Sequence, residues 1–228
     1  MAFTIEIPPL TSGDRLTRRE FERRYAGMPE DFKAELIEGV VYVASPVRYA
    51  SHGAPHTQIT TWLGVYCAAT SGVGMADNTT VRMDPFNEPQ PDIFLRLEPA
   101  VGGRSKVTSD DYIEGPPELI VEVAASSATY DLREKKTVYQ RNGVQEYLVW
   151  QIYERRLDWF YLHNDEYEQL QPDTEGIIRS RIFPGLHLDM PALLAGDLAR
   201  VLAIVQAGLQ TAEHTAFVER LRATSSSA

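Results

Sequence analysis

Cysteine is almost absent: the 228 residues contain one, Cys67. The chain therefore has no intramolecular disulfide and no cluster of thiolate metal ligands. Because Cys67 lies in the apolar helical pattern WLGVYCAAT, we interpret it as a small buried side chain. A chain without disulfides favours a reducing compartment, so we expect a cytoplasmic protein.

Long hydrophobic runs are also lacking. No apolar segment has the length of a membrane-spanning helix, and no basic stretch followed by an apolar run marks the N-terminus. We therefore expect no membrane partner. No repeat or internal linker is visible, and 43% hydrophobic residues suffice for one globular core.

Positive charge is in short supply, with 22 Lys and Arg against 32 Asp and Glu and a net charge of −10. This balance excludes a protein that coats nucleic acid by bulk electrostatics. It leaves room for an enzyme of nucleic acids, because bound metal ions and a local basic rim can attract phosphate.

The order of segments predicts an α/β fold in one domain. We expect a flexible N-terminal tail over 1–14, a single domain over 15–222 and a disordered tail over 223–228. Strand-like runs alternate with amphipathic helices. The first half of the chain predicts a helix in TRREFERRYAGMPE, a hairpin in AELIEGVVYVASP, a helix in PHTQITTWLGVYCAATSG, and strands in GVGMADNTTVRMD, QPDIFLRLEP and ELIVEVAA. The second half predicts a helix in DLREKKTVYQRNG capped by Asp131, strands in VQEYLVWQI and RRLDWFYLH, and a C-terminal helical segment.

Two acids lie in apolar strand patterns, whereas we interpret the other acids as solvated loop or helix charges. Asp92 begins the strand DIFLRL, and Glu122 lies inside ELIVEVA. A carboxylate buried in a strand must be paired, protonated or bound to a metal, so a structural salt bridge remains an alternative. If neighbouring strands bring the two acids together, a divalent cation relieves their repulsion, and oxygen ligands suit magnesium or manganese.

Lys135 is the candidate for the positive group that a phosphate-cutting site needs. It lies in the helix that follows the Glu122 strand after a short connection. That helix is expected to pack back onto the sheet, with Lys135 near the end of the strand. Lys136 is rotated by about 100° around a helix and is expected to face elsewhere. The alternative is that Lys135 is solvated surface.

These residues resemble the motif set of the Uma-two family of bacterial endonucleases, which have the restriction-endonuclease-like PD-(D/E)xK fold. The similarity runs from AELIEGVVYVASP to the start of the C-terminal helix. Its parts are Asp92 in PQPD, Glu122 in ELIVEVA, and the more distinctive pattern Asp131, Lys135, Tyr139, Gly143, Val144, Glu146 and Tyr147. The resemblance implies a mixed β-sheet flanked by helices, with a C-terminal helix.

The resemblance also implies a catalytic site. Asp92, Glu122 and the backbone carbonyl of Val123 would hold magnesium or manganese, and Lys135 would be the catalytic lysine. Usual members of the fold carry that lysine on the strand, where this chain has Ala124. The family's N-terminal acid maps to Glu35, with Glu38 close enough to compete.

The histidines of SHGAPHTQI, His52 and His56, precede a helix and could line the site or cap it. We assign them a structural role and leave them outside the metal shell. Tyr139 and Tyr147 are interpreted as packing residues.

The expected activity is metal-dependent hydrolysis of phosphodiester bonds in DNA. The alternatives are a nuclease-fold protein that no longer cuts and serves in binding or assembly, and a nuclease for RNA or branched DNA. A homodimer also remains open, because an apolar stripe follows the C-terminal helical segment and could cover the sheet or pair with a second copy. The stripe consists of Leu198, Val201, Leu202, Val205 and Leu209.

Overall fold

A computed structural model describes residues 7–226 of the chain. Its helices are α1 (Arg18–Tyr25), η1 (Tyr49–Gly53), α2 (Ala54–Ala69), η2 (Pro99–Val101), α3 (Ala128–Tyr130), η3 (Asp131–Lys135), α4 (Lys136–Arg141), α5 (Met190–Ala195), α6 (Leu198–Gly208) and α7 (Ala212–Ser225). Its strands are β1 (Ala34–Ile37), β2 (Val40–Val43), β3 (Val73–Asp77), β4 (Val81–Arg82), β5 (Ile93–Leu97), β6 (Lys106–Val107), β7 (Ile113–Glu114), β8 (Leu119–Ala124), β9 (Glu146–Gln151), β10 (Arg156–His163), β11 (Glu166–Gln169), β12 (Ile177–Arg179) and β13 (His187–Asp189).

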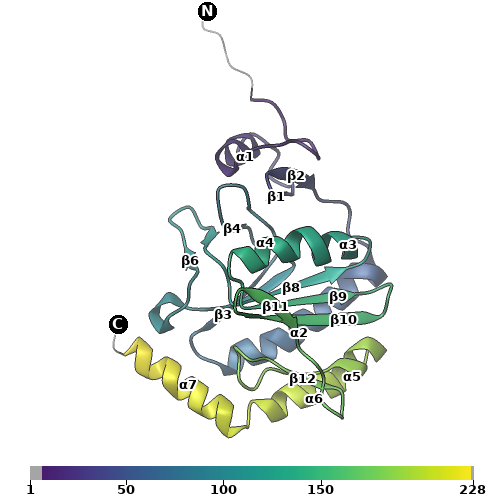
Figure 1. Cartoon of the computed structure of the whole chain (residues 1–228), viewed down its shortest axis with the longest axis vertical. Coiled ribbons are helices and arrows are strands. Elements are labelled where there is room, and N and C mark those ends of the chain that lie inside the picture. The colour runs from purple at the N-terminus through teal and green to yellow at the C-terminus, as the bar shows by residue number, and fades with distance from the viewer. Residues whose placement is uncertain (1–6, 227–228) are drawn as a thin grey trace, which may run out of the picture.

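The centre of the molecule is a six-stranded mixed sheet in the order β11-β10-β9-β8-β5-β3. Strands β8 and β9 are parallel, and the other neighbouring pairs are antiparallel. Every residue of β8 and of β9 is buried, as their near-continuous apolar sequences predict for central strands. The mixed sheet flanked by helices confirms the fold expected from the sequence (Figure 1).

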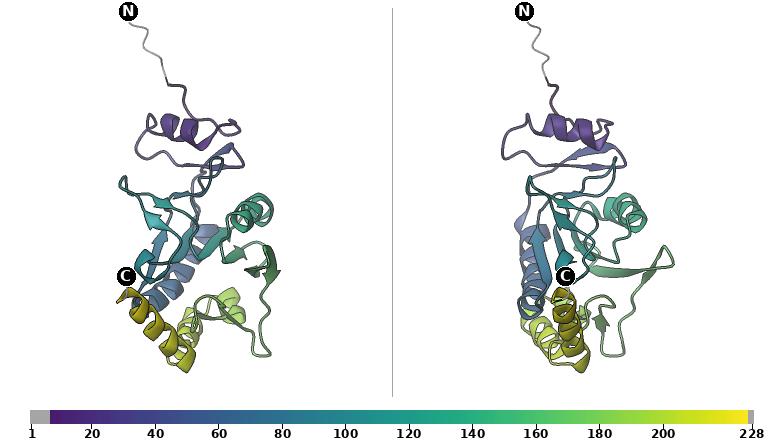
Figure 2. Two further views of the ribbon diagram at one scale, coloured as in Figure 1. Left: turned by 60° about the vertical axis from the view of Figure 1, so that its left-hand side comes forward. Right: turned by 90° about the vertical axis from the view of Figure 1, so that its left-hand side faces the viewer.

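Helices cover both faces of this sheet. Helix α2 packs on one face together with the C-terminal helices, and the helical run α3-η3-α4 packs on the other (Figure 2). In β8, Leu119, Val121 and Val123 belong to the α2 side, whereas Ile120 and Ala124 belong to the α4 side. Because side chains alternate along a strand, Glu122 faces α4.

The N-terminal elements form a separate small layer above the sheet, in which α1 packs on the β1–β2 hairpin (Figure 1). Thr17 caps α1 by accepting a hydrogen bond from the N–H of Glu20. The hairpin turns at Glu38 and Gly39, both with positive φ, at 52° and 71°. A side chain at Gly39 would also bring its Cβ to 3.0 Å from the carbonyl oxygen of Leu16, so the tight turn requires glycine.

Hydrogen-bonded structure extends beyond the predicted domain boundaries at both ends. Residues 1–6 of the predicted N-terminal tail lie outside the described residues, as do 227 and 228. Leu10 is buried, and the N–H of Gly13 donates to the carbonyl of Val41. At the other end, residues 223 to 225 belong to α7.

The predicted C-terminal helical segment is present as three consecutive helices, α5, α6 and α7. Gly196, with φ at 78°, ends α5. The apolar stripe packs on the core: Val201 and Val205 are fully buried, and Leu198, Leu202 and Leu209 contact the same cluster. The stripe therefore packs mainly within the chain, with Leu198, Leu202 and Leu209 partly buried, and a homodimer stays a prediction. Between residues 7 and 226, no helix combines the length and the apolar character that crossing a membrane requires.

Candidate active site

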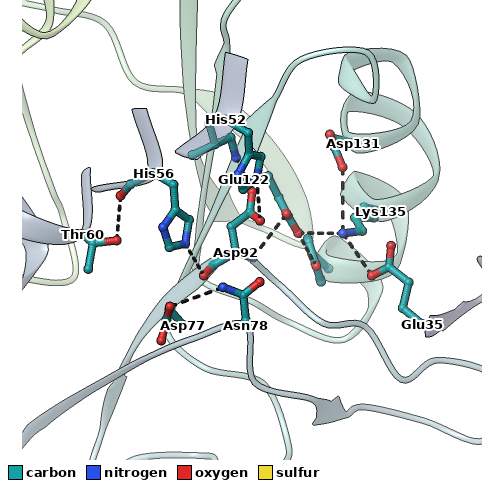
Figure 3. Close-up of polar contacts among 12 residues, drawn as sticks. Glu35, His52, His56, Thr60, Asp77, Asn78, Asp92, Glu122, Asp131 and Lys135 are labelled. Atoms are coloured by element: carbon teal, nitrogen blue, oxygen red, sulfur yellow. Dashed lines mark hydrogen bonds and ion pairs between the residues drawn. The ribbon is translucent and has the colours of Figure 1, made fainter. Parts of the chain in front are cut away.

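The sheet register places Asp92 opposite Glu122. Strands β5 and β8 pair antiparallel with Ile93 opposite Val121, and each acid is the next residue outward from that pair. The backbone N–H of Asp92 lies 3.4 Å from Oε2 of Glu122. The two acids singled out from the sequence therefore meet at one end of the β5–β8 pair (Figure 3).

Asp92 makes four further contacts. Its Oδ1 lies 3.0 Å from Nε2 of His52, and its Oδ2 accepts the backbone N–H of Val123 at 2.7 Å. Its carbonyl oxygen accepts the backbone N–H of Asn78 at 3.0 Å and lies 3.2 Å from Nε2 of His56. Burial alone raises the pKa of the Asp92 carboxyl, but the His52 imidazole and the Val123 N–H outweigh it and lower the pKa below its ordinary value. The pKa of Asp92 is therefore the lower one of the acid pair.

Glu122 is more deeply buried, with 3% of its surface exposed. Its Oε1 accepts hydrogen bonds from Lys135 Nζ at 3.0 Å and from the Tyr139 hydroxyl at 2.8 Å. Burial raises the pKa of Glu122 well above its ordinary value, and the nearby Asp92 charge adds to this, while Lys135 acts in the opposite direction. With two donors on Oε1, the other oxygen of Glu122 is the one turned toward Asp92.

Lys135 is buried at the centre of an acid cluster. Its Nζ lies 3.0 Å from both Glu122 and Glu35 and 3.9 Å from Asp131 (Figure 3). Burial works against the charged ammonium, but the three acids raise the pKa of Lys135 well above its ordinary value. Lys136 lies elsewhere, with its Nζ 3.6 Å from the centre of the Phe160 ring. The alternative that Lys135 is solvated surface is wrong.

Glu35, rather than Glu38, lies beside the lysine. It reaches the cluster from β1, where its Oε2 also accepts the N–H of Gln90 at 3.1 Å and its Oε1 accepts the Tyr130 hydroxyl at 3.3 Å. Glu38, in the hairpin turn, pairs instead with Arg141 at 2.7 Å. The small N-terminal layer thus contributes one carboxylate to the acid cluster.

The expected N-cap at Asp131 is wrong. The helical run starts three residues earlier, at Ala128, and Asp131 is buried in its first turns beside Lys135. Burial raises the pKa of Asp131 to about 6. The helix starts early because Ala128 can pack in the core of this face. A capping pattern in the sequence does not reveal this tertiary contact.

Sequence reasoning also missed three side chains at this site. His52 and His56 contact Asp92, and Tyr139 contacts Glu122. Spacing was the available signal, because Asp131, Lys135 and Tyr139 are four residues apart and share one helix face, as do the two histidines. The prediction that only two acids lie inside buried strands is also wrong: Glu146 in β9 and Asp158 in β10 are buried as well.

Among residues 7–226, the only two π-helical turns both carry residues of this site. The turn η1 contains His52, and η3 contains Asp131 and Lys135. A π turn holds more residues than an α turn and shifts the direction of the following side chains, and such turns are frequent at functional sites. The two segments approach the acid pair from different helices.

The residues present fit a divalent cation. The carboxyl groups of Glu35, Glu122 and Asp131 surround one ammonium group, and Asp92 lies beside Glu122, so the cluster has an excess of acidic groups. A cation beside Asp92 would offset the repulsion among these acids and lower the raised pKa of Glu122.

One backbone carbonyl of β8 points to the same side as Asp92. The carbonyls of Glu118 and Ala124 point to β9, where they accept the N–H groups of Glu146 and Ile152. Because carbonyl directions alternate along a strand, the carbonyl of Val123 points to the β5 side, where its N–H already bonds Asp92. In the described part of the chain no three His, Cys, Asp or Glu side chains form a ready metal cluster.

Comparisons with known proteins identify a structure of the same fold and a family. A search of curated proteins found no match. Among solved structures, the chain resembles the crystal structure of "a putative nuclease belonging to DUF820" from Anabaena variabilis. The TM-score is 0.58 with 14% sequence identity, over 76% of this chain and 96% of the other, which supports the shared fold. The model of the Uma2 family, described as "Putative restriction endonuclease", matches residues 18–191, and the chain therefore belongs to this family, the Uma-two family that its motifs resemble.

Proposed function

We propose that this protein is an endonuclease that hydrolyses phosphodiester bonds in DNA with the help of magnesium or manganese. Family membership supports nuclease chemistry. The observation that carries the proposal is the register of β5 and β8, which sets Asp92 opposite Glu122 with Lys135 Nζ 3.0 Å from Glu122. In metal-assisted phosphodiester hydrolysis, an acid pair can hold the metal ion and an adjacent lysine can act on the water or the phosphate.

Asp92, Glu122 and the Val123 carbonyl would hold the cation. When bound, it would polarise a phosphoryl oxygen and lower the pKa of a water molecule. Oxygen-only ligands favour magnesium or manganese over zinc.

The chain's own residues would position the attacking water and stabilise the charge on the phosphate. The acids around Lys135 keep it charged, so its ammonium can orient the attacking water or stabilise charge on the phosphate. Glu35 fixes Nζ from the side opposite Glu122, and the Tyr130 hydroxyl and the Gln90 N–H fix Glu35. Because Lys135 and Glu122 are nearly excluded from water, these electrostatic contacts act with little screening.

The net charge of −10 makes the alternatives worth testing in the same assay. Plasmid, linear and branched DNA and a single-stranded RNA are incubated with magnesium or manganese, comparing the wild-type protein with Glu122→Ala. We expect metal-dependent DNA cleavage that EDTA stops and that the variant loses, with its thermal unfolding midpoint confirming that it is folded.

Cleavage of RNA or of branched DNA alone would replace the proposed substrate. If no substrate is cut in a metal-dependent way, or if Glu122→Ala cuts as well as wild type, the proposal is wrong. The first of these results would favour a nuclease-fold protein that serves in binding or assembly.

A further inference from the structure

Asp92 has a hydrogen-bonding partner at every polar atom. Its N–H faces Glu122, and its Oδ2 accepts the N–H of Val123. Its carbonyl faces His56 and accepts the N–H of Asn78, and its Oδ1 faces Nε2 of His52 at 3.0 Å. Of these five contacts, the one from His52 is the only side-chain donor to the carboxylate. The direction of the Asp92 carboxylate therefore depends on one strand N–H and one imidazole.

The partners fix which nitrogen of each imidazole carries the proton. A backbone carbonyl can only accept, so Nε2 of His56 must be the donor to Asp92. Nε2 of His52 is likewise the donor, because it faces a carboxylate oxygen. The two rings are stacked, with centroids 5.5 Å apart and an interplanar angle of 17°. His56 thus supports the ring of His52 while holding the Asp92 backbone.

The π turn η1 sets His52 at this position. The N–H groups of His52 and Gly53 both donate to the carbonyl of Arg48, at 3.1 and 3.0 Å, which marks the widened turn. His52 and His56 are four residues apart, on either side of the junction between η1 and α2, and both reach Asp92 (Figure 3). Local backbone geometry, rather than core packing, directs His52.

We propose that His52 is a positioning residue that holds Asp92 in the orientation needed to bind the divalent cation. The proposal rests on the proposed function above. A histidine that hydrogen-bonds a ligating carboxylate fixes the direction of its free lone pairs, and such outer partners contribute strongly to metal affinity. His52 would act through Asp92 and would not itself bind the metal.

A purely structural role of His52 predicts a different effect of its removal. The His52 side chain is 24% exposed and lies outside the hydrophobic clusters, so its removal takes little packing from the core. If it serves only the start of the helix, its loss changes stability without changing metal affinity. If it positions Asp92, metal affinity falls as well, whatever the change in the stability of the metal-free protein.

Manganese binding separates the two forecasts. Calorimetric titration with manganese chloride is carried out on the wild-type protein, His52→Ala and His52→Gln, with thermal unfolding of each protein in EDTA. We expect His52→Ala to bind manganese about 10- to 100-fold more weakly than wild type. His52→Gln should recover most of the affinity, because the Gln amide nitrogen can donate from nearly the same position as Nε2.

His163→Ala is the matched control. This histidine also contacts an acid, with its Nδ1 2.8 Å from Oε1 of Glu168, but it lies on the exposed β10–β11 hairpin. It should bind manganese as wild type does.

Three results would overturn the inference: equal affinity of His52→Ala and wild type, failure of His52→Gln to recover what alanine loses, or absence of manganese binding by the wild type. The titration contains no substrate, so the first two results leave the nuclease proposal to the cleavage assay.

Discussion

Glu122 and Glu146 are both buried glutamates on neighbouring parallel strands, yet their surroundings differ completely. They are 3% and 0% exposed, respectively. Glu122 has a lysine, a tyrosine and three further acids around it. Glu146 accepts only from neutral donors: Trp159 Nε1 at 3.2 Å, the Ser180 hydroxyl at 2.8 Å, and the N–H groups of Arg181 and Ile182 at 2.6 and 3.2 Å.

This difference teaches that burial does not identify a functional acid, whereas its partners do. Four neutral donors satisfy both oxygens of Glu146 and tie β9 to the segment before β13, so nothing remains for a ligand. At Glu122 the other acids oppose its charge, and one lysine does not balance them. Clusters of this kind, with strongly shifted pKa values, are typical of catalytic sites.

Among substitutions that test this difference between Glu122 and Glu146, Lys135→Ala is expected to have the largest effect on cleavage. Lys135→Ala should lower DNA cleavage by about 100- to 1000-fold, the range seen when a group that stabilises transition-state charge is removed. It also leaves buried acids without their partner, which costs about 3–5 kcal/mol of folding free energy. Cleavage rates are therefore compared at a temperature where circular dichroism shows the variant to be folded.

Lys136→Ala is the matched control for that experiment. Its ammonium lies over the Phe160 ring rather than among the acids, so cleavage should stay within a small factor of wild type. The loss of stability should be about 0.5–1 kcal/mol, as for one cation–π contact. Equal effects of the two substitutions on cleavage would contradict the assigned position of the catalytic lysine.

A substitution of Glu146 is expected to have a smaller effect, and to change stability rather than cleavage. In Glu146→Gln an amide NH₂ replaces one acceptor oxygen and faces donors, which should destabilise the fold by about 1–3 kcal/mol. Cleavage by the folded protein should not change. Chemical denaturation and the plasmid assay measure the two quantities. Loss of cleavage without loss of stability would mean that Glu146, too, belongs to the active site.

The same variant tests the pH dependence of stability. Burial raises the pKa of Glu146 from 4.5 to about 7, although its donors lower it. The folded protein therefore binds this proton more tightly than the unfolded chain does. The stabilisation is present below about pH 4.5 and is lost as the pH rises through about 7. Across this range the unfolding free energy should fall more steeply for wild type than for Glu146→Gln.

Much of the fold followed from sequence patterns. The continuous apolar run of ELIVEVA predicted a central strand, and the Glu38-Gly39 pair predicted the β1–β2 turn, because both depend on local rules. The start of the helical run at Ala128 was missed because a tertiary contact of that residue decides it. The breaks between α5, α6 and α7 were missed because their amphipathic pattern continues across them.

The site was predictable in part for the same reason. Asp92 and Glu122 interrupt apolar strands and therefore stand out, and the chain's resemblance to its family pointed to Lys135. Glu146 was passed over although it too lies in a strand, because the Ser180 hydroxyl that satisfies it is 34 residues away in the sequence. His52 was passed over because its contact with Asp92 spans 40 residues and a π turn.

The central claim is that Asp92 and Glu122 form a cation site that Glu146 does not share. A crystal of the protein soaked in manganese chloride tests this directly through the anomalous signal of the metal. The account predicts one strong peak in contact with carboxylate oxygens of Asp92 and Glu122 and with the Val123 carbonyl, with Lys135 beside it. Manganese bound elsewhere, or the absence of a peak at these oxygens under saturating metal, would contradict the account.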